Sequence, residues 1–371
     1  MAIMLSMASR RCVVIGAGIL GASVAARLAA AGLRVTLLDQ DHPGRATSRW
    51  SFAWINSNDK GPRPYHDLNH AGMRAWAELA PDLDGDAWYR PVGHVELAVG
   101  GDSELEDRVK RLTGWDYPAR LVDPAQAAAL EPALRVPPGA TAAYFPGEGY
   151  LLTEPLIARL VARAESHGAH VRTGEPGRVT GLEPGATPRV RTAVGTVLEA
   201  DEVVCCAGRW TPALAQVPLI PWENRGSTAP ELVARIGPAP GLVRLVHTPE
   251  LSLRPHPGGL LHLEAEDAAV DLHTPEPGLR RWADELLGRA RRTVRGLGDA
   301  RIVEYKVCVR PLPADGQSIV GRLPGAPGIY VAVTHSGVTL AAHLARLITA
   351  DLTTGTPPAS LTPYTPARFT S

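Results

Sequence analysis

The chain has 371 residues, a length that gives room for two domains with ample hydrophobic cores. Hydrophobic residues make up 45% of the chain and charged residues 20%, which is typical of a globular protein in water. Because 38 basic side chains balance 38 acidic ones, the composition argues against nucleic acid or an anionic membrane as a partner.

The sequence offers no pattern for a membrane segment, a disulfide framework or a metal centre. No stretch approaches the roughly 20 apolar residues of a membrane span, and the first residues lack the apolar segment of a signal peptide. The four cysteines show no CxxC pair and no histidine at metal-ligand spacing: Cys12, Cys205, Cys206 and Cys308. We therefore expect a cytoplasmic protein without a membrane span or a metal, in which Cys12, Cys205 and Cys206 are small buried residues.

The first predicted elements form a β–α–β unit: a strand at Cys12–Ile15, a helix at Ile19–Ala31 and a strand at Val35–Leu38. In the turn VIGAGILG, Gly16 permits a tight bend, Gly18 lets the backbone approach a pyrophosphate, and Gly21 lets the helix pack closely. Asp39, at the end of the second strand, would accept hydrogen bonds from an adenosine ribose. The unit predicts dinucleotide binding, with NAD and FAD as equal alternatives at this point and incidental glycines in a plain turn as the structural alternative.

Helices and strands continue to alternate through the rest of the chain. Further helices are predicted at Pro64–Leu79, Ser103–Leu112, Pro124–Leu130, Glu154–Ser166, Pro277–Arg291 and Val338–Ala350. Strands are predicted at Val92–Val99, His170–Arg172, Arg178–Leu182, Val190–Ala193, Val197–Glu199, Glu202–Cys206, Val243–Thr248, Ser252–Arg254, Leu260–Glu264 and Ile329–Val333.

We expect two interleaved domains, each built from separated segments. A Rossmann-like nucleotide-binding domain is predicted at 1–80, 142–216 and 301–371. A substrate-binding domain with a mixed sheet is predicted at 81–141 and 217–300. The predicted fold class is therefore α/β plus α+β.

Five stretches spread over the chain decide between the two nucleotides. They are VIGAGILG with Asp39, GRATSRWS, PGEGYLLTEPLIARL, VVCCAGRW, and RPLPADGQSIVG followed by HSG. In this order they resemble the D-amino-acid oxidase family of flavoenzymes, which includes glycine oxidase and sarcosine oxidase. The resemblance covers nearly the whole chain, and it implies the two-domain fold of glycine oxidase, FAD as the cofactor and an amine-oxidising enzyme.

The resemblance also implies where FAD binds. The hydroxyls and guanidiniums of GRATSRWS suit the pyrophosphate and ribityl chain, and HSG places the N-terminus of the last helix at the flavin N1 and O2 edge. An exposed polar loop and a plain helix cap are the structural alternatives. The implied cofactor-binding residues are Gly16, Gly18, Ile19, Leu20, Gly21, Asp39, Gln40, Arg45, Thr47, Ser48, Arg178, Val179, Ala207, Gly208, Trp210, Arg310, His335, Ser336, Gly337, Val338, Thr339 and Leu340.

The family's reaction is oxidation of an amine carbon–nitrogen bond, in which hydride passes to flavin N5 and an imine forms. Arg310 falls where the family places the arginine that binds the substrate carboxylate, which implies a small amino or imino acid as substrate. A salt bridge to an acid such as Asp315 is the structural alternative for Arg310. His262 and His94 are further catalytic candidates for the flavin face, with ordinary hydrogen bonding as the alternative. Candidates for the pocket entrance are Trp50, Trp54, Asn56 and Tyr65, with core packing as the alternative for the tryptophans.

Two features bear on the comparison with sarcosine oxidase, and two alternative functions stay open. Cys308 falls where sarcosine oxidase carries a cysteine bonded to flavin, but many members bind FAD without that bond, so we expect non-covalent FAD with attachment as the alternative. The oxygen-activating lysine of sarcosine oxidase has no counterpart between Lys110 and Lys306, which argues against fast turnover as an oxidase. The expected electron acceptor is O2 or another acceptor. The rival functions are an NAD-dependent dehydrogenase, which the HSG helix disfavours, and a flavin-binding subunit of a larger amine dehydrogenase complex.

Overall fold

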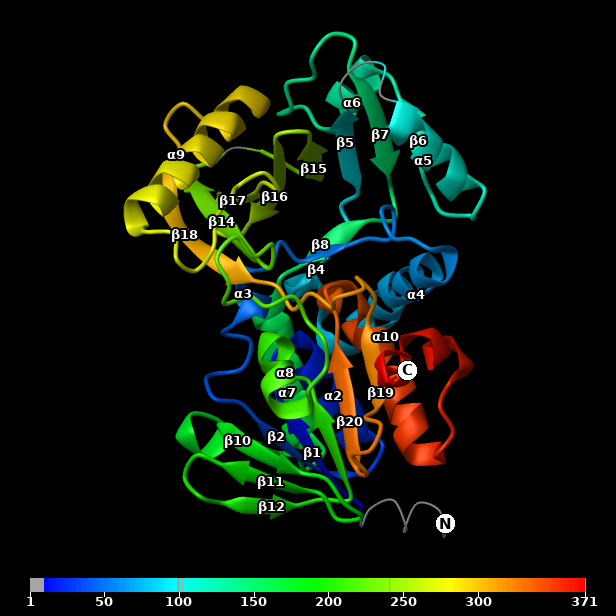
Figure 1. Ribbon diagram of the computed structural model, residues 1–371. Helices are drawn as coiled ribbons and strands as arrows, with labels where there is room; N and C mark the ends of the chain where they lie inside the picture. Colours follow the sequence, from blue (N-terminus) through cyan, green and yellow to red (C-terminus); the bar gives the residue numbers. More distant parts are fainter. Residues whose placement is uncertain (1–9, 99–100, 102, 240, 371) are drawn as a thin grey trace.

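The computed structural model describes residues 10–98, 101, 103–239 and 241–370. The chain is built around two large sheets, one in the lower half and one in the upper half of Figure 1. It passes repeatedly between these two regions, so each region is assembled from segments that lie far apart in the sequence.

The lower sheet has six strands in the order β19–β20–β13–β1–β2–β9, and all but the edge strand β19 are parallel. Its central strands are continuous apolar runs, because both faces of the sheet are covered. The strands are β1 (Arg11–Ile15), β2 (Arg34–Leu38), β9 (His170–Arg172), β13 (Glu202–Cys205), β19 (Ile319–Arg322) and β20 (Ile329–Val333).

Helices cover one face of the lower sheet, and a small three-stranded sheet covers the other. The helix α2 packs against both α7 and α10, and α4 packs on α10. On the opposite face, an apolar cluster joins Val190 of the small sheet to Val13 and Val203. The helices are α2 (Ile19–Ala30), α4 (Arg63–Leu79), α7 (Thr153–Ser166) and α10 (Gly337–Thr354), and the small sheet contains β10 (Val179–Glu183), β11 (Arg189–Thr192) and β12 (Val197–Glu199).

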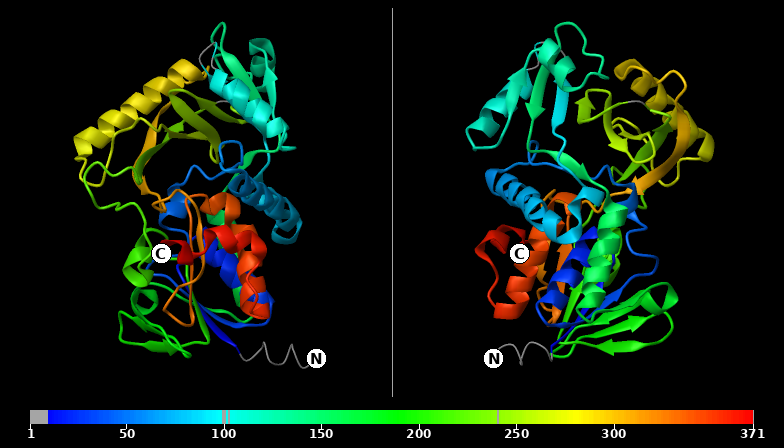
Figure 2. Two further views of the ribbon diagram at one scale, coloured as in Figure 1. Left: turned by 45° about the vertical axis from the view of Figure 1, so that its right-hand side comes forward. Right: turned by 180° about the vertical axis from the view of Figure 1, so that it is seen from behind.

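The upper sheet has eight strands in the order β18–β14–β17–β16–β15–β5–β7–β6, antiparallel except for the pair β15–β5. Its strands are β5 (His94–Ala98), β6 (Arg120–Val122), β7 (Thr141–Phe145), β14 (Pro230–Gly237), β15 (Leu245–Thr248), β16 (Leu251–His256), β17 (Leu260–Glu264) and β18 (Arg301–Val309). The long helix α9 (Glu276–Thr293) lies along its outer face, as both views in Figure 2 show. The helices α5 (Ser103–Thr113) and α6 (Pro124–Leu130) pack on β7.

Strand alternation gives the upper sheet two different faces. Leu261 and Leu263 point outward and join Leu286 of α9 in one buried apolar cluster. His262 and Glu264 alternate with these leucines and point to the inner face, toward the lower region. By the strand register, the polar residues of this inner face include Glu231, Arg235, Ser252, Arg254, His262, Glu264, Glu304, Lys306 and Cys308.

Short elements join the two regions. A three-stranded sheet of β3 (Trp54–Ile55), β8 (Gly149–Leu151) and β4 (Tyr89–Arg90) lies between them, together with α3 (Thr47–Trp50). The short helix α8 (Thr211–Ala215) packs on β13 and β20 of the lower sheet and on β10. Arg235 and Arg254 of the inner face donate hydrogen bonds to the carbonyl oxygens of Arg49 and Phe52, so the inner face is anchored to the segment that follows α3. Short 3-10 helices occupy Ala80–Leu83, Gly85–Ala87, Glu175–Gly177, Gly208–Trp210, Ala359–Tyr364 and Pro366–Phe369.

The predicted β–α–β unit is confirmed to within one residue at each end. The strand β14 was not predicted, and of β18 the sequence marks only the run 304–308, EYKVC, as strand-like, because both strands pair with partners distant in the sequence. Pairing places β7 and β18 in the upper sheet, whereas the predicted boundaries at 142 and 301 assign them to the nucleotide-binding domain. We therefore propose domain boundaries that follow the pairing, after β7 and after β18.

All four cysteines are buried and free, as predicted for Cys12, Cys205 and Cys206. Within the described ranges, no group of three or more metal-ligating side chains could hold a metal ion. None of the helices in that part of the chain combines the length and the apolar character needed to cross a membrane.

Candidate functional site

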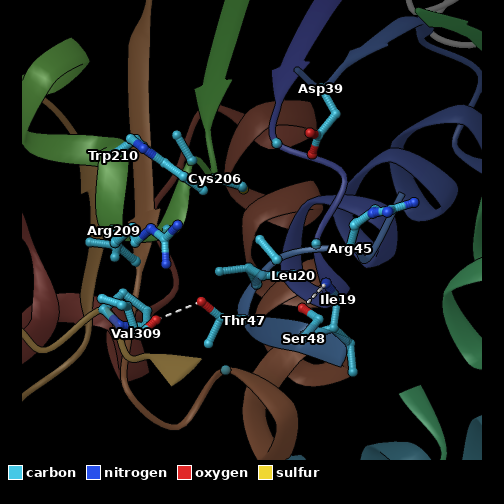
Figure 3. A pocket seen from close by; sticks show the side chains of 18 of the residues that line it. Ile19, Leu20, Asp39, Arg45, Thr47, Ser48, Cys206, Arg209, Trp210 and Val309 are labelled. Atoms are coloured by element: carbon cyan, nitrogen blue, oxygen red, sulfur yellow. Dashed lines mark hydrogen bonds between the residues drawn. The ribbon is translucent and has the colours of Figure 1, made fainter. Parts of the chain in front are cut away.

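A cavity of about 810 Å³ lies at the carboxyl ends of the parallel strands and extends to β18 of the upper sheet. This edge of a parallel sheet is where α/β proteins bind ligands. Figure 3 shows Ile19 and Leu20 near Ser48 on one side of the cavity, with Arg209 and Trp210 on the other. The sequence-predicted residues that line it are Gly16, Gly18, Ile19, Leu20, Asp39, Gln40, Arg45, Thr47, Ser48, Arg178, Val179, Ala207, Gly208, Trp210, His335, Gly337 and Val338.

The glycine turn at the start of α2 leaves no room for side chains at two of its positions. Gly16 has φ +95°, and a Cβ added there would lie 2.4 Å from the carbonyl oxygen of Cys206. A Cβ at Gly21 would lie 1.8 Å from the carbonyl oxygen of Gly16. At Gly18, by contrast, a Cβ would meet only the Ser48 hydroxyl, at 3.2 Å. The backbone at Gly18 is therefore open to the cavity, as the phosphate-binding role requires.

Asp39 stands at the end of β2 and lines the cavity. Its carboxylate accepts hydrogen bonds from the backbone N–H groups of Ala17, at 2.6 Å, and Asp41, at 2.9 Å. Burial raises the pKa of Asp39, and these two hydrogen bonds act against that rise because they favour the ionised form. The carboxylate thus ties the strand end to the glycine turn while it faces the cavity.

The helix α3 carries hydroxyl groups to the N-terminus of α2. The Ser48 hydroxyl accepts a hydrogen bond of 3.0 Å from the Ile19 N–H, and the Thr47 hydroxyl donates one of 2.6 Å to the carbonyl of Val309; Figure 3 shows both. Arg45 is exposed and lies 3.6 Å from the carboxylate of Asp41. This arrangement brings hydroxyls and an exposed guanidinium to the place where a pyrophosphate would meet the helix.

At the other end of the cavity, the N-terminus of α10 contributes His335, Gly337 and Val338. The other side chains predicted from the HSG stretch point elsewhere. The Ser336 hydroxyl accepts a hydrogen bond from the Tyr65 hydroxyl at 3.2 Å, and the Thr339 hydroxyl donates one to the carbonyl of Trp54 at 3.2 Å. Leu340, like Gly21, is buried outside the cavity lining. These groups hold α10 in place, whereas the backbone at its start faces the cavity.

Two cations of the cavity lining were not predicted. The guanidinium of Arg209 lies between two indole rings, 4.1 Å from the centroid of Trp210 and 4.9 Å from that of Trp222. Lys306 reaches the cavity from the inner face of β18 and lies 6.0 Å from the Trp50 ring centroid. The alternation of β18 could have indicated Lys306, had the strand been predicted to its full length.

Arg310 lies directly after β18 but is not among the residues that line the cavity. Its guanidinium pairs with Glu231 at 3.3 Å and donates to the carbonyl of Thr228 at 2.6 Å. The alternative partner named from the sequence, Asp315, instead pairs with Arg368 at 2.7 Å. The acid beside Arg310 is therefore Glu231 of β14.

The two candidate histidines are both buried in the interface between the regions. His262 is 0% exposed, its ring meets Phe52 edge-on at 5.9 Å, and neither of its nitrogens has a hydrogen-bond partner within the described ranges. His94 lies 3.1 Å from the carboxyl of Glu148, and burial lowers its pKa to about 3. Neither histidine lines the cavity.

Glu148 is the centre of a buried polar network. Besides the contact with His94, it accepts hydrogen bonds from the Tyr117 hydroxyl at 2.6 Å, the Trp54 indole at 2.9 Å and the Asn58 amide at 3.2 Å. Burial raises the pKa of Glu148 to about 8. The network joins β5 to the β7–β8 turn and the segment after β3, so it connects the two regions.

A family model described as FAD dependent oxidoreductase, DAO, matches residues 11–351. The chain is an FAD-dependent oxidoreductase of the DAO family. Glycine oxidase of Pseudomonas aeruginosa is 28% identical over 384 residues, covering 97% of this oxidoreductase and 99% of that enzyme. Crystal structures of iminodiacetate oxidase from Chelativorans sp. BNC1 and of glycine oxidase from Geobacillus kaustophilus share the fold. Their TM-scores are 0.79 and 0.80, at 24% and 22% identity, and they cover 96% of this chain and 99% and 98% of theirs.

The family implies FAD as the cofactor of this oxidoreductase, and the residues of the cavity fit it. Gly18 leaves its backbone open, the first N–H groups of α2 have no partners within their helix, and the Asp39 carboxylate faces the same space. The cavity continues from these groups to the N-terminus of α10 and to Cys308. It therefore offers polar groups for an ADP half at one end and a helix N-terminus for a flavin at the other.

Proposed function

We propose that this oxidoreductase oxidises the carbon–nitrogen bond of a small amino or imino acid and forms an imine. One observation carries the proposal: the cavity that would hold FAD extends to the polar inner face of the upper sheet. Lys306 and Cys308 of β18 line the cavity, and Arg310 follows on the same strand end. A polar substrate between the cavity and this face would meet charged side chains, and the names of the relatives, glycine oxidase and iminodiacetate oxidase, support the same substrate class.

Arg310 would bind the substrate carboxylate. Its guanidinium offers a planar set of donors that suits a bidentate carboxylate pair, and it is already oriented by the carbonyl of Thr228. Glu231, 3.3 Å from the guanidinium, would keep it in position beside the substrate.

Bound FAD would supply the redox chemistry by accepting the hydride that leaves the substrate carbon. The chain binds and orients it: the residues of the α2 turn and Asp39 would hold the ADP half, and the start of α10 would hold the flavin. The positive end of the α10 dipole would favour negative charge at that place.

The seam between α3 and the upper sheet would keep water from the reacting atoms. The guanidinium of Arg235 lies 4.7 Å from the Trp50 ring centroid, and that of Arg254 lies 5.0 Å from the Tyr150 ring centroid. Together with the hydrogen bonds to the carbonyls of Arg49 and Phe52, these contacts pack the inner face of the upper sheet against α3 and the residues after it.

The test is a spectrum of the purified protein followed by anaerobic titration with amino acids, imino acids and amines that lack a carboxylate. We expect flavin absorbance that bleaches with a carboxylate-bearing amine and returns with O2 or with an artificial electron acceptor. A protein that is colourless and binds NAD would contradict the proposal. Intact flavin that no amine reduces would favour a flavin-binding subunit of a larger complex.

A further inference from the structure

Glu264 ends β17 and points to the inner face of the upper sheet. Its direct neighbours across the sheet are Val233 on β14 and Ser252 on β16. Val233 is in turn paired with Lys306 on β18, which lines the cavity. One row of side chains therefore leads from the cavity wall to Glu264 over two strand spacings, roughly 10 Å.

The Glu264 carboxyl has no hydrogen-bond donor and no ion-pair partner within the described part of the chain. The charges that act on it are those of Glu231 on β14, Arg254 on β16, Arg310 after β18, and Glu266 beyond the end of its own strand. The other titratable groups on its side of the sheet are His262, Arg235, His247, His256, Glu304, Lys306 and Cys308.

A second observation marks this part of the inner face as a polar site rather than a packed core. His262, two residues before Glu264 on the same face, is fully buried with both ring nitrogens unpartnered within the described ranges. The Nε of Arg235, directly opposite His262, is likewise unpartnered there. Buried polar atoms without partners are costly unless a ligand or water satisfies them.

Burial and the neighbouring charges act together on the pKa of Glu264. Burial raises its pKa well above the ordinary value, and the charge of Glu231 adds to this rise, whereas Arg310 and Arg254 act against it. Of the two neighbouring carboxyls, Glu231 is held by Arg310 at 3.3 Å. Glu264 is therefore the carboxyl on this stretch of the sheet that is free to accept a proton.

An amine substrate needs such a group. In water at neutral pH the amine is an ammonium ion, and hydride can leave its carbon only when the nitrogen lone pair is free to form the carbon–nitrogen double bond. We propose that Glu264 is the catalytic base that removes the proton from the substrate ammonium, an inference that rests on the proposed function. In this step one N–H bond breaks, its electron pair stays on nitrogen, and an O–H bond forms on the Glu264 carboxylate. Cation and anion disappear together, and nothing is oxidised or reduced.

The test uses the FAD-loaded enzyme and 2-aminoisobutyrate, an amino acid without a hydrogen on its α carbon, so that it binds without being oxidised. Its dissociation constant is measured from the change in flavin absorbance between pH 6.5 and 9.5. In the parent enzyme we expect nearly constant affinity below the pKa of the amine, because the proton moves from the ammonium to Glu264 within the complex. In Glu264→Gln only the uncharged amine should bind, because no group accepts its proton. The affinity should therefore rise about tenfold per pH unit up to the pKa of the amine.

A second readout is the rate of flavin reduction by an oxidisable amino acid, which should fall by roughly a hundredfold or more at pH 7 in Glu264→Gln and recover as the pH rises. Glu264→Asp keeps a carboxyl and should retain part of the flat profile. Glu250→Gln, an exposed carboxyl in the turn before β16, is the matched control, and FAD content and circular dichroism verify folding.

Coincident pH profiles of the parent enzyme and Glu264→Gln, in both binding and reduction, would overturn the role of Glu264. Failure of the proposed function itself looks different, because the parent enzyme would then neither bind 2-aminoisobutyrate nor be reduced by any amino acid.

Discussion

The backbone N–H of Ala17 donates a hydrogen bond of 2.6 Å to the Asp39 carboxylate, and this bond joins the glycine turn before α2 to the end of β2. The same carboxylate lines the FAD cavity. One side chain thus shapes the turn that would receive the pyrophosphate and faces the space where the adenosine ribose would lie.

Asp39→Ala should therefore weaken FAD retention by roughly tenfold or more, as expected for the loss of a charge-assisted hydrogen bond. The measurement is flavin content after extended dialysis. Asp284→Ala is the matched control, since that exposed carboxylate of α9 pairs with Arg280 and lies outside the cavity lining. Equal flavin content in both variants would argue against the assignment.

Arg310→Leu should raise the substrate concentration for half-maximal flavin reduction by roughly ten- to a hundredfold for a carboxylate-bearing amine. An analogue without the carboxylate should be affected little, because it makes no use of the guanidinium. Asp315→Asn serves as a control, since Asp315 pairs with Arg368 and not with Arg310. Equal losses for both compounds would mean that Arg310 serves the fold or the flavin.

FAD should be released into the supernatant when the protein is precipitated with acid, because we expect no bond to Cys308. The thiol is buried, its sulfur lies 3.9 Å from the carbonyl oxygen of Thr47, and burial raises its pKa to about 12. The thiolate that would attack the flavin is therefore scarce at neutral pH. Colour that stays in the pellet and is freed in Cys308→Ser would contradict this expectation.

Glu148→Gln should change how stability depends on pH. The pKa of Glu148 is about 8 in the fold against an ordinary value of 4.5, so the unfolded chain releases this proton at lower pH than the folded protein does. Between pH 4.5 and 8 the folded state alone keeps the proton, and the free energy of unfolding falls as pH rises, by up to about 1.4 kcal/mol per unit.

Glutamine has no proton to release, so the free energy of unfolding of the parent protein should fall relative to that of Glu148→Gln across this window. Denaturant titrations at several pH values measure the difference. The contribution of His94, whose pKa lies near 3 in the fold, affects both proteins and cancels to first order. Glu199→Gln, on an exposed strand, is the control, and parallel curves for the parent and Glu148→Gln would contradict the prediction.

The nucleotide-binding unit could be predicted because its signals are local. Gly16, Gly21 and Asp39 lie within one short β–α–β stretch, where turn geometry and apolar runs decide the structure. The end of the upper sheet where β14 meets β18 could not be predicted in the same way. Its two strands lie about 70 residues apart in the sequence, and no turn motif indicates that they pair with each other.

The same limit applied to the candidate site. The sequence placed Arg310 near a carboxylate ligand by resemblance, but its partner Glu231 is set by strand register across β14 and β18. The inward direction of Lys306 and Glu264 likewise follows from that register. Of the residues predicted from the HSG stretch, some line the cavity and others do not. At the start of α10 the backbone faces the cavity, whereas a side chain such as that of Thr339 points away from it.

Along β14, β16, β17 and β18, alternate residues have two different roles, packing on one face of the sheet and polar chemistry on the other. Positions that pack under α9 form one apolar core, and the intervening positions point to the inner face without entering that core. A change at His262 or Glu264 therefore leaves the apolar layer intact. Such a sheet can exchange its substrate-facing chemistry one residue at a time while the scaffold that carries it keeps its shape.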